Sequence, residues 1–176
     1  MLRRRALSLA LLLLPAVARA QTRAGTTDIQ AIGAGPFEFP ITGSFRVQRE
    51  GRATVFSAAD ESIRFTVGFF QRRSEAAASD DPLAAVEALV RNSWERFAKS
   101  ENGRIVRAFE RVTSPSGLTL FSMATEFKVN SDQQYYVQFA VTDGARVGTL
   151  FAEGFGSALS SLRELEPKVR QVRIAQ

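Results

Sequence analysis

The stretch from Asp81 to Gly103, DPLAAVEALVRNSWERFAKSENG, decides the fold because it has the pattern of one long amphipathic helix. Asp81 can cap the first free backbone amides, and Pro82 suits the first helical position. Asn102 and Gly103 supply a left-handed stop at the other end. Apolar side chains at spacings of three and four residues predict one buried stripe: Leu83, Val86, Leu89, Val90, Trp94 and Phe97. This stripe needs a flat apolar partner, and the rest of the chain predicts a sheet.

Segments that alternate apolar and polar residues lie on both sides of this helix. We expect strands over 45–48, 52–58 and 62–70 before it, and over 104–112, 118–129, 134–142 and 147–153 after it. Turn residues such as Asp143-Gly144 separate them, which favours antiparallel pairing. A short second helix starts near Ser157 and ends at Pro167, and residues 169–174 form a last extended piece. The prediction is an α+β fold, an antiparallel sheet of about six to seven strands between a long central helix and a short C-terminal helix.

The two faces of this sheet are expected to differ in the size of their side chains. We expect the long helix to cover the face with mostly large residues. The C-terminal helix is expected on the other face, where small residues allow a close approach: Gly68, Ser122, Ala124, Ala140, Gly148 and Ala152.

The first twenty residues have the pattern of an export signal. Arg3, Arg4 and Arg5 precede an apolar run over 6–17, and Ala18-Arg19-Ala20 fits a cleavage site. The run is short and contains a proline, so we expect no stable membrane anchor. The predicted organisation is a signal peptide over 1–20 cleaved near Ala20, a flexible segment over 21–35 and a single domain over 36–174, located in the periplasm or secreted.

Charge and composition exclude several function classes. The chain has 23 basic and 18 acidic residues, but four of the arginines lie in the predicted signal, which leaves 19 against 18. This balance does not support a nucleic-acid partner. The chain has no histidine and no cysteine, which removes the Ser-His and Cys-His catalytic pairs and the commonest metal ligand. We therefore predict no cofactor, no metal and no enzymatic activity. A hydrolase that uses carboxylates alone is the remaining enzyme hypothesis.

The order of elements resembles that of the PsbP-like proteins, which include the photosystem II extrinsic subunit, the Ran-binding Mog proteins and the bacterial DcrB-like envelope proteins. The segments that carry the resemblance are Phe37 to Pro40 leading into Phe45, Pro82 to Lys99, Gly117 to Leu120, Tyr135 to Ala140 and Leu159 to Glu166. It covers roughly residues 36–174. The resemblance implies a non-catalytic role in protein binding or assembly.

Two groups of residues are candidates for partner binding. Arg64, Arg72 and Arg73 can form a basic patch, although solvated charges at a sheet edge are the more usual explanation for such residues. Phe70 and Tyr136 are expected on the face opposite the bulky core, where they are either exposed or covered by the closing helix.

The leading functional hypothesis is an exported periplasmic accessory protein that docks on another protein of the cell envelope. The alternative is a carrier of a small apolar ligand, held between the sheet and the long helix. Six aromatic residues were candidates for the lining of such a pocket: Phe65, Phe69, Trp94, Phe97, Phe121 and Phe139.

Overall fold

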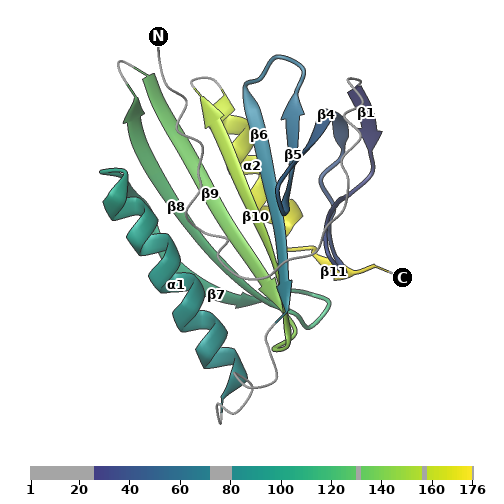
Figure 1. The fold of residues 1–176 in the computed structure, drawn as a ribbon, viewed down its shortest axis with the longest axis vertical. Helices are drawn as coiled ribbons and strands as arrows, with labels where there is room; N and C mark the ends of the chain where they lie inside the picture. The colour runs from purple at the N-terminus through teal and green to yellow at the C-terminus, as the bar shows by residue number, and fades with distance from the viewer. Residues whose placement is uncertain (1–25, 72–80, 130–131, 156–157, 176) are drawn as a thin grey trace.

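The computed structural model describes residues 26–71, 81–129, 132–155 and 158–175. Figure 1 shows how these residues form two helices and a large twisted sheet. The elements in chain order are β1 (Thr26–Ile29), β2 (Ile32–Ala34), β3 (Phe37–Phe39), β4 (Gly43–Glu50), β5 (Ala53–Ala58), β6 (Ile63–Gln71), α1 (Pro82–Ser100), β7 (Arg104–Thr113), β8 (Thr119–Val129), β9 (Asp132–Thr142), β10 (Arg146–Phe155), α2 (Ala158–Val169) and β11 (Arg173–Ile174). The predicted signal peptide lies outside these residues.

The main sheet has eight strands in the order β1-β4-β5-β6-β10-β9-β8-β7, and every pair is antiparallel. Seven of them, β4 to β10, are the strands that the alternating pattern predicted. The eighth, β1, comes from the segment predicted to be flexible over 21–35. The four residues of β1 are polar or only partly buried, so they show no alternation, and they form a strand because β4 offers a free edge. The predicted count of six to seven strands was therefore too low.

A second, three-stranded sheet has the order β11-β3-β2. The strand β2 also lies in the segment predicted to be flexible, and its Ile32 is fully buried. The domain thus includes residues 26–34, and the predicted boundary at residue 36 was wrong for them. Pro167 does not end the second helix as predicted, because α2 continues to Val169. A proline in the last turn removes only one backbone hydrogen bond, and the helix ends within two residues of it.

Helix α1 begins and ends as the sequence predicted. The Asp81 carboxylate accepts from the backbone amides of Leu83 and Ala84 at 3.0 and 2.9 Å. Asn102 takes the left-handed conformation after the last turn, with φ at 53°. The buried stripe is Val86, Val90, Trp94 and Ala98. Leu89 is 56% exposed, so its predicted place on the stripe was wrong.

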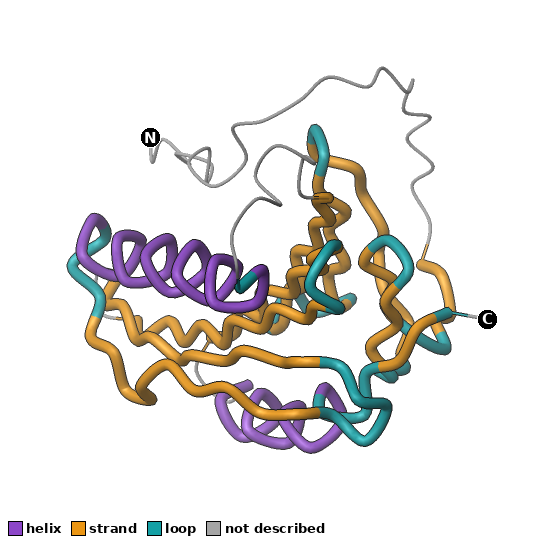
Figure 2. Tube along the Cα trace, turned by 90° about the horizontal axis from the view of Figure 1, so that it is seen from below, coloured by secondary structure: helices purple, strands orange, loops and turns teal. Residues whose placement is uncertain are grey.

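The two helices lie on opposite faces of the main sheet, which confirms the layered arrangement (Figure 2). We call these faces the α1 face and the α2 face. On the α1 face, α1 packs against β7 and β8. On the α2 face, α2 packs against β9 and β10, and side chains of the small sheet join the same apolar cluster.

The predicted assignment of helices to a bulky and a small face was wrong in part, because two of the six small residues lie on the face beneath α1. Ala140 belongs to the cluster beneath α1, and Gly68 lies on the same side of β6 as Phe70 of that cluster. Ala124 and Ala152 belong to the cluster beneath α2. Alternation within one strand separates its two faces, but only the register between strands decides which faces join.

Candidate functional site

The α1 face carries a line of polar side chains across four neighbouring strands. Arg64 of β6 is opposite Glu153 of β10, Glu153 is opposite Tyr136 of β9, and Tyr136 is opposite Thr125 of β8. Gln138 follows two residues after Tyr136 and points to the same side of β9. We call these five residues the polar row. They lie beside the apolar and aromatic cluster beneath α1 and include two groups with shifted pKa values, so they are the candidate functional site of the domain.

Glu153 is the ionisable centre of the polar row. Burial raises the pKa of its carboxyl group, and the nearby Tyr136 hydroxyl, which donates to Oε1 of Gln134 at 3.4 Å, and the charge of Arg64 partly oppose this rise. Burial is also the main cause that raises the pKa of the Tyr136 hydroxyl, with a smaller contribution from the charge of Glu153. Both groups therefore favour their neutral forms more than they would in water.

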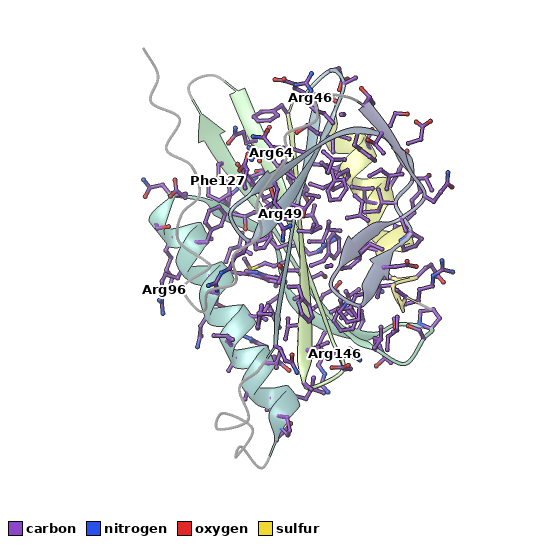
Figure 3. The ribbon with its side chains drawn as sticks, turned by 45° about the vertical axis from the view of Figure 1, so that its right-hand side comes forward. Arg46, Arg49, Arg64, Arg96, Phe127 and Arg146 are labelled. Atoms are coloured by element: carbon purple, nitrogen blue, oxygen red, sulfur yellow. The ribbon has the colours of Figure 1, made fainter. Side chains whose placement is uncertain are left out.

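Arg64 is opposite Glu153 but forms its ion pair with another residue. Its Nη2 lies 3.1 Å from Oε2 of Glu50 on β4, and its side chain is 38% exposed. Figure 3 labels Arg64 of β6 and Phe127 of β8. The row therefore runs from a partly solvated arginine to side chains that are completely buried, Thr125 and Gln138.

Aromatic rings close the inner end of the row. The ring centroid of Tyr136 lies 5.0 Å from that of Phe127 and 5.9 Å from that of Phe97 on α1, and the Phe97–Phe127 distance is 5.3 Å. These contacts leave Tyr136 only 8% exposed. The sequence predicted that the closing helix would cover Tyr136 if Tyr136 were buried. The C-terminal half of α1 covers it instead. Tyr136 is therefore no exposed aromatic contact for a partner.

The structure brings together only part of the predicted site. Arg64 and Tyr136 come within reach of the same carboxylate, that of Glu153. Phe70 lies six residues from Arg64 on the same side of β6, half-buried against the apolar cluster beneath α1. Arg72 and Arg73 lie outside the described residues. The sequence analysis did not select Glu153. The pattern that marks it is an acid on the same side of its strand as the apolar Val147 and Phe151.

The aromatic residues proposed to line an apolar pocket do not meet on one face. Trp94 and Phe121 belong to the cluster beneath α1, whereas Phe65 and Phe139 belong to the cluster on the other face. A hollow of about 230 Å³ does lie at the start of α1, and its lining is Pro82, Leu83, Gly117, Thr119, Thr142, Asp143 and Gly144. Its volume is below that of ordinary small-molecule sites.

Within the described residues, no three acidic side chains gather as a metal site would require. None of the helices in the described ranges is long and apolar enough to cross a membrane. The polar row itself offers hydrogen-bond donors and acceptors to a bound group.

Comparison with known proteins identifies the fold. No protein-family model matches the chain, and no curated protein sequence matches it. The solution structure of cyanobacterial PsbP (CyanoP) from Synechocystis sp. PCC 6803 is similar, with a TM-score of 0.61 and 8% identity over 90% of this chain and 98% of that one. LpqN of Mycobacterium tuberculosis, described as involved in cell envelope biogenesis, matches with a TM-score of 0.49 and 15% identity over 86% and 91% of the two chains.

Proposed function

From the PsbP-like fold of this chain, we propose that it is an exported, non-catalytic accessory protein that docks on another protein of the cell envelope. The pattern of the first twenty residues supports export. The lack of histidine and cysteine supports a binding role over a catalytic one.

The observation that carries the docking proposal is the uneven cover of the main sheet. The α2 face is covered by α2 and the small sheet. On the other face, α1 packs against β7 and β8 at one side of the sheet. Figure 2 shows that the sheet continues beside the helix. The main contacts of α1 are with β7 and β8, and of the strands β4, β5 and β6 it is Phe70 of β6 that joins the apolar cluster beneath α1.

The outer part of the α1 face is polar and charged. Alternation and register place Arg46, Gln48 and Arg64 there, and both arginines hold surface ion pairs, Arg46 with Glu61 at 3.3 Å and Arg64 with Glu50 at 3.1 Å. Mixed charges of this kind fix the orientation of a partner and exclude wrong ones. We therefore place the docking surface on β4, β5 and β6.

Site-specific photo-crosslinking tests this placement. A photoreactive amino acid at Gln48, exposed on the proposed surface, should capture one dominant envelope protein in the native host at physiological expression. The same amino acid at Arg163, exposed on α2, is the matched control and should not capture it. Capture of the same protein from Arg163 alone, or of nothing from Gln48, would contradict the proposed surface.

Two measurements test the remaining parts of the proposal. Mass spectrometry of the protein purified from its host should give a chain that begins at Gln21. A full-length chain in the cytoplasm would contradict export. Turnover in broad ester, peptide or glycan panels would contradict the non-catalytic role.

A further inference from the structure

The polar row holds most of the hydrogen-bonding atoms that the described part of the chain leaves without a partner. Six buried side-chain nitrogen or oxygen atoms have none. Four of them belong to the row: Nε of Arg64, Oγ1 of Thr125, and both amide atoms of Gln138. Buried polar groups without partners are rare and costly in native proteins, and ordered water satisfies many of those that protein groups do not.

Gln138 shows the problem most clearly. Its side chain has 0% exposure, and the register places it between Phe151 on β10 and Met123 on β8. An amide in these surroundings has two donors and one acceptor oxygen that need partners. Thr125, which is also completely buried, is the diagonal neighbour of Gln138 on β8. Diagonal neighbours are about 7–8 Å apart, and no direct hydrogen bond joins the Gln138 amide and the Thr125 hydroxyl, so one small molecule between them can bond to both.

Arg64 and Glu153 repeat this arrangement at the outer end of the row. They face each other directly across β6 and β10 and carry opposite charges. The ion pair of Arg64 nevertheless goes to Glu50, and the Nε of Arg64 has no partner. A donor and an acceptor that face each other without a direct bond are the usual surroundings of a bridging water.

We propose that ordered water molecules occupy the polar row between α1 and the sheet. One bridges the Gln138 amide and the Thr125 hydroxyl, and a second bridges Nε of Arg64 and the Glu153 carboxylate. This inference goes beyond the proposed docking function and does not depend on it.

The chemistry of the row selects water over other ligands. The unpartnered groups are the donors on Arg64 and Gln138, the acceptor oxygen of Gln138 and the Thr125 hydroxyl, and the Glu153 carboxylate beside them can accept further hydrogen bonds, so the ligand must donate and accept. A cation would offer no hydrogen to the acceptors and would be repelled by Arg64, and an anion would be repelled by Glu153. A larger neutral molecule needs a cavity of several hundred cubic ångströms. Water needs only two to four polar partners and the volume of one small molecule.

A double-mutant cycle in urea tests the inner water. The substitutions Gln138→Met and Thr125→Val each remove one partner of the bridge at nearly constant volume. If the water is present, each single substitution lowers the urea midpoint. The stability lost in the double variant is then smaller than the sum of the two single losses, and the difference corresponds to about a fivefold change in the folding equilibrium constant. If the row is dry, each change removes an unsatisfied buried group, so each raises the midpoint and the effects add. That second result would overturn the proposal.

The control uses a buried hydroxyl whose partners are direct. The Thr142 hydroxyl donates to the Arg146 carbonyl at 2.7 Å and accepts from the Gly144 amide at 2.9 Å. Thr142→Val should lower the midpoint and add to Gln138→Met without coupling, because no group joins the two residues. Coupling as large as that of Thr125→Val would overturn the bridge.

A spectroscopic readout on the unsubstituted protein covers both waters. Nuclear Overhauser cross-peaks from water should reach the side-chain NH₂ of Gln138 and the Nε proton of Arg64. The absence of both cross-peaks, with the side-chain protons otherwise visible, would overturn the proposal even if a variant failed to fold.

Discussion

A four-charge network between β7 and α2 provides the sharpest test of how this domain is held together. Glu166 accepts from Arg107 and from Arg170, the latter at 2.8 Å, and Arg170 also donates to Glu110 at 3.0 Å. The strand β7 has register shifts on both sides of Arg107, and these bulges accompany the turn of Arg107 and Glu110 toward α2. The network therefore fastens the edge strand to the closing helix.

The perturbation is Glu166→Gln, which keeps the shape of the side chain and removes its charge. It weakens two ion pairs whose side chains are 24% to 41% exposed. Each such pair contributes about 0.2–1 kcal/mol, and Arg107 already has two buried nitrogens without partners. We expect a loss of roughly 1–2 kcal/mol, which lowers the melting temperature of a domain of this size by about 2–8 °C.

The assay is thermal unfolding followed by circular dichroism at low and high salt. The matched control is Glu61→Gln, because the Arg46–Glu61 pair is 55% and 67% exposed. We expect this control to lower the melting temperature by no more than about 2 °C. Added salt should reduce the effect at Glu166 only in part, since the network is partly shielded from solvent.

The comparison of the two variants can refute this reasoning. Equal shifts for Glu166→Gln and Glu61→Gln would mean that partial burial adds nothing to the network. A stabilised Glu166→Gln variant would mean that desolvation of the four charges outweighs their attraction.

Two further predictions concern the α1 face. Burial raises the pKa of Glu153, so the folded chain binds this proton more tightly than the unfolded chain, and the resulting stability is present at low pH and is lost as pH rises through the folded pKa. Glu153→Gln should therefore raise the urea midpoint at pH 7 and lose this advantage near pH 4; a constant advantage at both values would contradict the assignment. Trp94→Ala should destabilise the domain by about 3–5 kcal/mol because Trp94 is 3% exposed, whereas Leu89→Ala on the solvent side of the same helix should stay within about 0.5 kcal/mol in the same urea titration.

Part of the candidate site could be predicted from the sequence. Arg64 and Tyr136 were named as candidates, and the structure shows both beside Glu153. Glu153 itself was missed because one acid in a strand pattern looks like any solvent-facing residue until the neighbouring strands are placed. Gln138 lies in the same kind of pattern, as one polar residue of a predicted strand, and it is completely buried.

Local patterns determined the bounds of α1 and the positions of seven strands. The cap at Asp81 and the stop at Asn102 depend on interactions within a few residues, and the alternation of apolar and polar residues in β4 to β10 is visible in the sequence. The strand β1 could not be seen, because its polar residues become a strand only through the edge of β4.

Only the tertiary structure decided which side chains share a face. The alternation of one strand is unchanged when its neighbour slips by one residue, but the slip moves every side chain of that neighbour to the other face. The register of β6, β10, β9 and β8 therefore decides that Gly68 and Ala140 lie toward α1 and that Ala124 and Ala152 lie toward α2. The same register assembles the polar row, which no single segment of the chain contains.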